Sequence, residues 1–243
     1  MKIFLTGATG YIGKRLLIQL LEEGHRVVCS VRDKKRLSLK LYQNHLDKIE
    51  IIENDFLDKN TLANIPKDID FAYYLVHSMS SNDGDFLEKE RISAQNFRKA
   101  LENTSVKQVV FLTGIINEEK LSKHLQSRKN VEQALKSNHY ALTCLRAGII
   151  VGSGSASFEI IRDLVEKLPI MVAPKWLKTK CQPIAIRNVI QFLIKVLGVE
   201  KTYHQNYDIA SDDVLTYKEM LQQYAEVRKL KRWIYTVPVM TPK

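Results

Sequence analysis

The sequence has no long apolar run and few cysteines. No stretch of the 243 residues reaches the roughly 18 apolar residues of a membrane span, and residues 1–5 already have the pattern of a strand, so we expect neither a spanning helix nor a signal peptide. The three cysteines, Cys29, Cys144 and Cys181, are widely spaced, which excludes a disulfide framework and a cysteine metal site. We therefore expect reduced core thiols, no bound metal and a cytoplasmic protein.

Motifs for nucleic-acid binding are absent as well, although the formal net charge is +10. Basic residues cluster at 32–36 and again at 228–232, where the second cluster ends an expected helix and suits the helix dipole. We expect no nucleic-acid partner. The chain also shows no internal repeat and no low-complexity linker.

The segment KIFLTGATGYIG at residues 2–13 is the most informative motif. An apolar strand leads into Gly7, Gly10 and Gly13, and a helix with leucines at helical spacing follows. Gly7 allows a tight turn, Gly10 lets the backbone approach a pyrophosphate, and Gly13 lets the helix lie close to the sheet. The first N–H groups of the helix then face the phosphates. These glycines, together with Thr9, Tyr11 and Ile12, predict a dinucleotide site, whereas a bare glycine triplet would also fit a plain loop.

Strands and helices alternate along the first 150 residues. Strands are expected at 2–6, 26–31, 49–53, 69–76, 107–113 and 141–150, and helices at 11–23, 34–43, 59–64, 84–102 and 121–137. This order predicts an α/β Rossmann fold, in which a doubly wound parallel sheet binds its ligand at the carboxyl ends of the strands. Residues 1–152 are expected to form this domain. Residues 153–243 are expected to form a smaller C-terminal lobe on the substrate side, with a helix over 155–168, a proline-punctuated loop to 183, a helix over 186–197, a strand over 206–210 and a last helix opened by a Thr216–Glu219 capping box.

GATGYIG after the first strand resembles the extended and atypical short-chain dehydrogenase/reductase superfamily, near its NmrA-like and sugar-epimerase-like members. Asn54-Asp55, the run from Tyr73 to Ser78, Val109 to Gly114 and Arg146 to Gly152 extend this similarity over nearly the whole chain. HLQSRKNVE at 124–132 and GSGSASFE at 152–159 resemble an atypical bacterial branch, whose longer members carry a further C-terminal domain. The resemblance implies that Asp55 and Phe56 border the adenine and that Val76 and His77 line the nicotinamide-side ribose.

Cofactor preference is predicted from the end of the second strand. Arg32 lies where a basic residue would accept the 2′-phosphate of NADP(H), because a guanidinium pairs well with phosphate. The alternative is that Arg32 is an ordinary surface residue and that Asp33 binds the ribose of NAD(H). We favour NADP(H), and NAD(H) remains possible.

The catalytic positions differ from those of the family. Its tyrosine and lysine, four residues apart on one helix, correspond here to His124 and Arg128. His124 could donate the proton and Arg128 could hold the ribose, while Thr113 stands where the family has a hydroxyl that orients the substrate carbonyl. The alternative is a surface helix in which Arg128 pairs with Glu132.

Two functions follow from these positions. One is an NADP(H)-dependent oxidoreductase or epimerase that acts on an unknown small carbonyl or hydroxyl substrate, with Ser153, Ser155 and Phe158 lining the substrate pocket. The other is a non-catalytic NmrA-like redox sensor or assembly factor, which would have a partner protein. Loss of the tyrosine–lysine pair favours the second function, and the serine-rich loop favours the first.

Overall fold

The computed structural model describes residues 1–76, 86–116 and 123–237, with the side chains of residues 123–125 left out. The chain forms two compact units. The first comprises Met1–Arg146 and Ile190–Asp208, and the second comprises Ala147–Val189 and Ile209–Lys243. The sequence predicts a single boundary between residues 152 and 153. The structure instead places the first boundary after Arg146 and assigns Ile190–Asp208 to the first unit.

The first unit is built on a seven-stranded sheet with the order β11-β6-β5-β4-β1-β2-β3. Its strands are β1 (Lys2–Thr6), β2 (Arg26–Val31), β3 (Ile49–Glu53), β4 (Phe71–Tyr74), β5 (Gln108–Gly114), β6 (Ala141–Ala147) and β11 (Asn206–Ile209). β1 runs parallel to both of its neighbours, so that Leu5 lies opposite Cys29 on β2 and Tyr73 on β4. The strand order reverses at β1, which is where an open α/β sheet binds its ligand.

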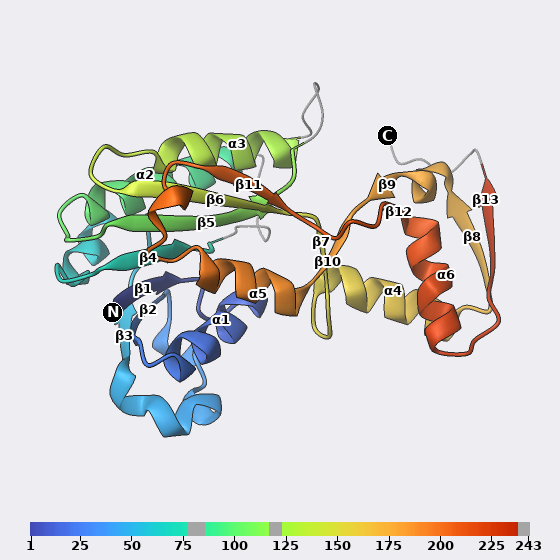
Figure 1. The fold of residues 1–243 in the computed structure, drawn as a ribbon, viewed down its shortest axis with the longest axis horizontal. Coiled ribbons are helices and arrows are strands. Elements are labelled where there is room, and N and C mark those ends of the chain that lie inside the picture. Colours follow the sequence, from blue (N-terminus) through green and yellow to red (C-terminus); the bar gives the residue numbers. More distant parts are fainter. Residues whose placement is uncertain (77–85, 117–122, 238–243) are drawn as a thin grey trace. The chain divides into compact units, whose positions relative to one another are not determined.

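Helices cover both faces of this sheet, which confirms the predicted Rossmann class (Figure 1). α2 (Phe86–Leu101) and α3 (Lys123–Leu135) lie on one face, and α1 (Tyr11–Glu22) lies on the other with the later part of α5 (Ile186–Lys195). The predicted apolar stripe of α1 is buried, and Gly24 with φ +84° follows the end of the helix.

The expected helix over 34–43 is wrong. The segment instead forms two 3₁₀ stretches, η1 (Lys34–Arg36) and η2 (Leu39–Lys48), and the second is interrupted by non-helical dihedrals at Tyr42 and His45. The expected helix over 59–64 is likewise the 3₁₀ segment η3 (Lys59–Asn64). Tyr42 is the one buried side chain of η2, so this segment lacks the apolar face that would hold a longer α-helix against the sheet.

Aromatic rings form the centre of the core between the sheet and α2. The Phe97 ring packs against three others, with centroid separations of 6.1 Å to Phe4, 5.5 Å to Phe56 and 4.8 Å to Tyr74. All four side chains are buried. This cluster packs the C-terminal half of α2 against β1 and β4.

Buried polar groups tie residues 190–208 to the first unit. The Gln108 side chain, fully buried at the start of β5, donates to Thr143 Oγ1 at 2.8 Å and to the Val196 carbonyl at 3.1 Å, and accepts from the Gly198 N–H at 2.8 Å. The Tyr73 hydroxyl donates to the Leu193 carbonyl at 2.9 Å. Since each buried polar atom needs a partner, these bonds fix the returning segment on the sheet. The bonds to Leu193, Val196 and Gly198 connect residues about 90 to 120 positions apart, and no local sequence pattern predicts such contacts.

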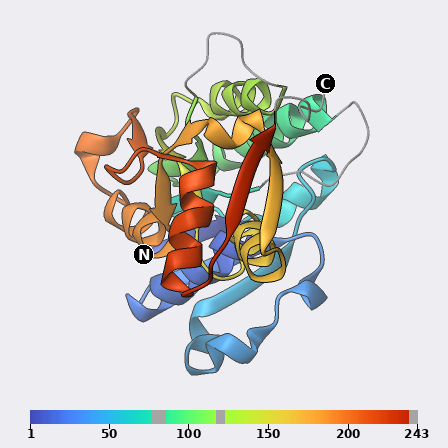
Figure 2. The same cartoon turned by 90° about the vertical axis from the view of Figure 1, so that its right-hand side faces the viewer.

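The second unit is a small helix and strand assembly. Its elements are β7 (Ile149–Val151), α4 (Ala156–Lys167), β8 (Ile170–Pro174), η4 (Lys175–Lys178), β9 (Lys180–Cys181), β10 (Pro183–Ala185), β12 (Leu215–Thr216), α6 (Tyr217–Val227) and β13 (Trp233–Val237). β8 and β13 pair in parallel, with α6 beside them (Figure 2). The core includes Ile161, Val165, Met171, Leu221 and Ile234. The capping box at Thr216 and Glu219 is confirmed.

Two sequence expectations for this unit were wrong. The proline-punctuated loop contains β8, and its partner β13 was not foreseen because the two strands are more than 50 residues apart in the chain. The expected strand 141–150 is divided into β6 and β7 at Gly148. A Cβ at Gly148 would lie 1.9 Å from the Gln182 carbonyl oxygen. The backbone at Gln182 therefore approaches position 148 so closely that only glycine fits there.

Candidate dinucleotide and catalytic site

The turn after β1 is shaped by Gly7. Its φ is +69°, and an added Cβ would lie 2.7 Å from the Leu75 carbonyl oxygen. The Thr6 hydroxyl donates to the Tyr73 carbonyl at 3.0 Å and accepts from the Leu75 N–H at 2.9 Å. The carboxyl ends of β1 and β4 are therefore held together directly beside the turn.

Gly10 and Gly13 serve different purposes in this turn. An added Cβ at Gly13 would lie 2.1 Å from the Gly7 carbonyl oxygen, so this glycine is required by the protein's own packing. At Gly10 the same test gives a 3.2 Å contact with the Gly7 carbonyl oxygen, which a shift of a few tenths of an ångström would relieve, and φ is −79°, which any residue adopts. The protein alone therefore has little need of glycine at position 10, and the space in front of it is available to a ligand.

The N-terminus of α1 is suited to bind phosphate. In the described part of the chain no side chain caps it, because the N-cap residue is Gly10. The Gly10 N–H itself bonds the Gly7 carbonyl at 2.9 Å. The N–H groups of Tyr11, Ile12 and Gly13 occupy the first turn, where no intrahelical acceptor exists, and they point out of the helix end. Thr9 is half-buried just before this turn.

Tyr11 has a buried hydroxyl that finds no hydrogen-bond partner within the described residues. The Arg15 guanidinium carbon lies 4.1 Å from the centroid of the Tyr11 ring, and Arg15 Nη1 donates to the Tyr11 carbonyl at 3.0 Å. A buried unpaired hydroxyl is costly in a protein, and a bound ligand is one way of satisfying it.

The end of β2 carries the residues predicted to select the cofactor. Arg32 is exposed immediately after the strand. Asp33 is already engaged, since its carboxylate accepts the Lys35 N–H at 2.9 Å as the N-cap of η1. Sequence reasoning did not consider Glu53 at the end of β3, whose Oε1 accepts the Lys34 N–H at 2.8 Å. The two acids thus fix the local turn and leave Arg32 as an exposed cation beside it.

The ends of β3 and β4 hold the positions expected to border the adenine and the ribose. The Asp55 carboxylate accepts the Leu57 N–H at 2.9 Å. The Phe56 ring lies in the core, and its carbonyl accepts from Asn96 Nδ2 at 2.7 Å in a buried hydrogen bond. Val76 is half-buried beyond β4. His77 lies outside the described residues.

Thr113 lies at the carboxyl end of β5, two strands from β1. Its side chain is buried, and its Oγ1 has no hydrogen-bond partner among the residues that the structure describes. A hydroxyl in this state fits the orienting role predicted for it, because a substrate oxygen would supply the missing partner.

The start of α3 carries His124 and Arg128. The backbone of His124 is helical, and its side chain lies outside the described part. Arg128 is half-buried, and this burial lowers the pKa of its guanidinium, while the negative charge of Glu90 acts in the opposite direction. The alternative pairing of Arg128 with Glu132 is wrong. Glu132 is buried and accepts Arg146 Nη2 at 2.9 and 3.1 Å.

The serine-rich loop belongs to the second unit. Ser155 caps α4 by accepting the Phe158 N–H at 3.2 Å, and the Phe158 ring packs edge-on against Tyr224 with 5.5 Å between centroids. Ser153 is exposed. These contacts give Ser155 and Phe158 structural roles within their own unit. Their assignment to a substrate pocket stays a prediction.

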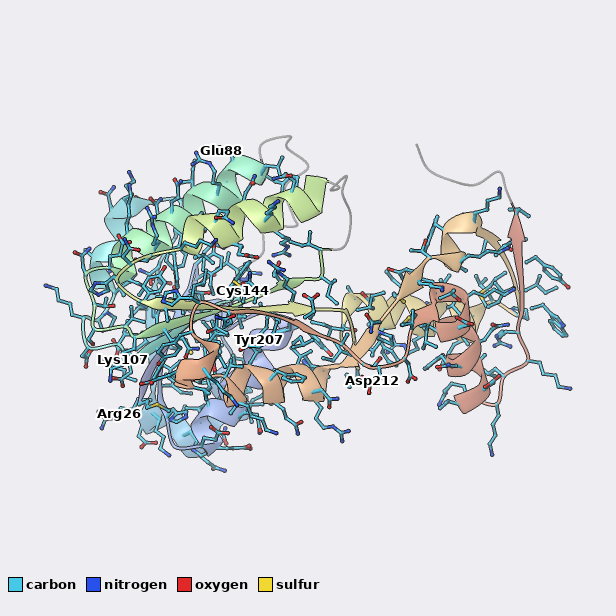
Figure 3. The ribbon with its side chains drawn as sticks, turned by 45° about the horizontal axis from the view of Figure 1, so that its top comes forward. Arg26, Glu88, Lys107, Cys144, Tyr207 and Asp212 are labelled. Carbon is cyan, nitrogen blue, oxygen red and sulfur yellow. The ribbon has the colours of Figure 1, made fainter. Side chains whose placement is uncertain are left out.

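Within the first unit, the structure brings the predicted residues of β1, α1, β2, β3, β4 and β5 to one edge of the sheet. Arg26 and Lys107, at the amino-terminal ends of β2 and β5, mark the opposite edge (Figure 3). Together, the switch point, the glycine turn and the uncapped helix define a dinucleotide-binding Rossmann fold. None of the helices in the described ranges has the length and apolar character needed to cross a membrane.

The sequence matches the NAD(P)H-binding family over residues 7–156, which is more than half of the chain. The protein therefore belongs to that family. No curated protein sequence matches the chain.

Solved structures show the same fold. MoeE5 in complex with UDP-glucose and NAD is 16% identical, with a TM-score of 0.76 over 98% of this chain and 85% of that chain. UDP-N-acetylglucosamine 4-epimerase from Bacillus cereus is 17% identical, with a TM-score of 0.76 over 98% and 85%. A short-chain dehydrogenase/reductase superfamily protein from Agrobacterium tumefaciens with bound NAD is 13% identical, with a TM-score of 0.77 over 98% and 85%. The chain thus shares the fold of the epimerases and short-chain dehydrogenases.

Proposed function

We propose that this protein is an NADP(H)-dependent oxidoreductase or epimerase that acts on a small carbonyl or hydroxyl compound. The observation that carries the proposal is the uncapped N-terminus of α1 behind Gly7, Gly10 and Gly13, at the point where the strand order reverses. The chain's residues fit a dinucleotide there because a Cβ at Gly10 would enter ligand space, whereas its contact with the fold itself is much milder than the contacts that require glycine at positions 7 and 13.

NADP(H) is favoured over NAD(H) by the side chains at the end of β2. Arg32 is exposed and basic, while the Asp33 carboxylate caps η1. The guanidinium would pair with the 2′-phosphate. Several similar structures hold NAD, so both cofactors belong in the test.

The cofactor, when bound, supplies or accepts the hydride at the substrate carbon. Thr113 would orient the substrate oxygen through its unpartnered hydroxyl, and His124 would donate or accept the proton at that oxygen. Arg128 would hold the nicotinamide-side ribose as a permanent cation.

The test measures NADPH consumption by the purified protein against a panel of aldehydes and ketones, and epimer formation from UDP-sugars with bound dinucleotide, because an epimerase returns the hydride and consumes no cofactor. UDP-sugars are included because similar structures contain UDP-glucose and UDP-glucuronic acid. We expect turnover with at least one compound. His124→Ala should lower that turnover by roughly 10²-fold while hardly changing NADPH affinity. Unchanged turnover in this variant would remove His124 from the chemistry.

A redox sensor that binds NADP(H) without turnover is the second candidate. Replacement of the tyrosine and lysine by His124 and Arg128 favours it. Tight NADPH binding with neither NADPH consumption nor epimer formation across the whole panel would favour the sensor.

A further inference from the structure

The outward face of the paired strands β8 and β13 is apolar and aromatic. Ile170 lies opposite Trp233, and Val172 lies opposite Tyr235. These four side chains are 60%, 52%, 61% and 58% exposed, in that order. The alternate residues of both strands are buried in the core of the second unit. A sheet with one face in solvent usually carries polar side chains on that face, so a contiguous apolar surface there indicates an interaction site. The four residues are called the β8–β13 face below, and the two strands lie side by side in Figure 2.

The two segments that hold this face carry a large excess of positive charge. Residues 166–180 and 227–237 contain one acid, Glu166, and eight cationic residues: Lys167, Lys175, Lys178, Lys180, Arg228, Lys229, Lys231 and Arg232. Glu166 pairs with Arg228 at 3.0 Å, and Lys167 pairs with Asp163 at 2.8 Å. Most of the positive charge is therefore left to attract a negatively charged partner.

Exposed lysines adjoin both ends of the β8–β13 face. Lys175 and Lys178 follow β8, whereas Lys229 and Lys231 precede β13. Because the strands run parallel, the first pair lies at one end of the face and the second pair at the other. Lysine stems are long and flexible, so the ammonium groups can reach negative charges at the level of the strands.

An anionic lipid surface matches this combination of side chains. Tryptophan and tyrosine favour the boundary between lipid headgroups and acyl chains, aliphatic side chains favour the acyl region, and lysines are attracted to the lipid phosphates. A second copy of this chain matches poorly. Both ends of the face are basic, so two copies placed face to face would bring like charges together in any orientation. Nucleic acid also matches poorly, because Ile170 and Val172 offer no ring on which a base could stack.

We propose that the β8–β13 face docks the second unit on the surface of an anionic phospholipid bilayer. The side chains of the face enter the headgroup region, and the lysines at its two ends contact lipid phosphates. Such binding needs no membrane-spanning helix, and it weakens as the salt concentration rises. The proposal is independent of the cofactor site, which is assigned to the first unit.

Vesicle sedimentation of the full chain tests this proposal. The vesicles consist of phosphatidylcholine alone or of phosphatidylcholine mixed with phosphatidylglycerol. We expect binding to the mixed vesicles and binding at least about tenfold weaker to phosphatidylcholine alone. The double variant Trp233→Ser, Tyr235→Ser should bind the mixed vesicles about tenfold or more weakly, with little change in unfolding temperature because both side chains are exposed. Wild-type binding in this double variant would overturn the proposal.

Phe192→Ser is the matched control for the apolar side chains. Phe192 is an exposed aromatic residue of the first unit, and its replacement should leave vesicle binding at the wild-type level. Weakening equal to that of the Trp233→Ser, Tyr235→Ser variant would show that any exposed aromatic ring contributes, which would overturn docking by the β8–β13 face.

The charges have a matched control of their own. Lys229→Gln with Lys231→Gln should weaken binding to the mixed vesicles by about fivefold to 30-fold. Lys195→Gln with Lys201→Gln removes the same net charge from exposed positions of the first unit and should leave binding nearly unchanged. Equal losses in the two lysine variants would show attraction by net charge alone and would overturn the proposal.

Tryptophan fluorescence reports on the face directly. The chain has two tryptophans, Trp176 and Trp233, so Trp176→Phe leaves Trp233 as the only probe. Its emission should shift to shorter wavelengths when mixed vesicles are added, because the indole leaves water. An unshifted emission would overturn the proposal. A dimer or an RNA complex that requires Trp233 and Tyr235, formed by a protein that binds neither kind of vesicle, would assign the face to that partner and overturn it as well.

Discussion

The glycine turn after β1 and the start of α3 serve the same predicted site but are built in different ways. The turn depends on backbone, since Gly7 and Gly13 are required by contacts within the turn and with Leu75. The start of α3 depends on side chains, since the Ser127 hydroxyl donates to the buried Glu90 carboxylate from another helix. Backbone requirements can be recognised from local sequence spacing, whereas side-chain partners 37 residues apart cannot.

The largest expected effect separates the two glycines of the turn. Gly10→Val should lower NADPH affinity by more than about 100-fold with a smaller change in unfolding temperature than Gly13→Val, because the valine side chain would enter the pyrophosphate space while its Cβ requires the Gly7 carbonyl to shift by only a few tenths of an ångström. Gly13→Val should instead destabilise the fold by about 1–3 kcal/mol, since its Cβ would clash with the Gly7 carbonyl.

Titration of NADPH fluorescence and thermal unfolding of both variants would check this. Retained binding in a folded Gly10→Val protein would place the dinucleotide elsewhere.

The next effect concerns the phosphate end of the site. Arg32→Ala should remove a preference for NADPH over NADH worth about 1–3 kcal/mol, because the guanidinium forms charge-assisted hydrogen bonds to the 2′-phosphate. The affinities of the variant for the two dinucleotides are compared with those of the wild type. A variant that keeps the wild-type preference contradicts the role of Arg32.

A smaller effect is expected at Thr113, where stability and function should separate. Replacing the buried, unpartnered hydroxyl with a methyl group in Thr113→Val should leave the free energy of unfolding unchanged or raise it by up to about 1 kcal/mol. Turnover on any substrate found should fall about tenfold or more. A clear loss of stability would show instead that the hydroxyl has a structural partner.

The fold was largely predictable from the sequence, because strand length, leucine spacing in α1 and the Thr216 capping box are local signals. The return of residues 190–208 to the first unit was not predictable. It depends on the buried side chain of Gln108, which reads locally as an ordinary polar residue before a strand. The pairing of β8 with β13 was missed for the same reason.

For the candidate site, the sequence indicated the glycine turn, Arg32 and Thr113, because each directly adjoins a strand end. It did not indicate the buried contact between Glu90 and Ser127 at the start of α3, since a charged and a polar residue within helices usually lie at the surface. The pairing of Glu132 with Arg146 could not be predicted either, because i, i+4 spacing favoured Arg128 as the partner.

The smallest effect lies in the second unit and serves as a contrast. Thr216→Ala removes the side chain that accepts the Glu219 N–H at 3.1 Å, and it should lower the free energy of unfolding by about 1 kcal/mol through fraying of α6. NADPH affinity should not change, because every cofactor position predicted here lies in the first unit. Weakened NADPH binding would show that the second unit contributes to the cofactor site.

The central claim is that the uncapped N-terminus of α1 binds a dinucleotide, with NADPH preferred through Arg32. The most direct measurement is a calorimetric titration of the wild-type protein with NADPH and, separately, with NADH, both at the same ionic strength. The account predicts binding of one dinucleotide per chain, with NADPH tighter by about 1–3 kcal/mol. Equal affinities would contradict the NADPH preference, and absence of binding by both dinucleotides would contradict the claim itself.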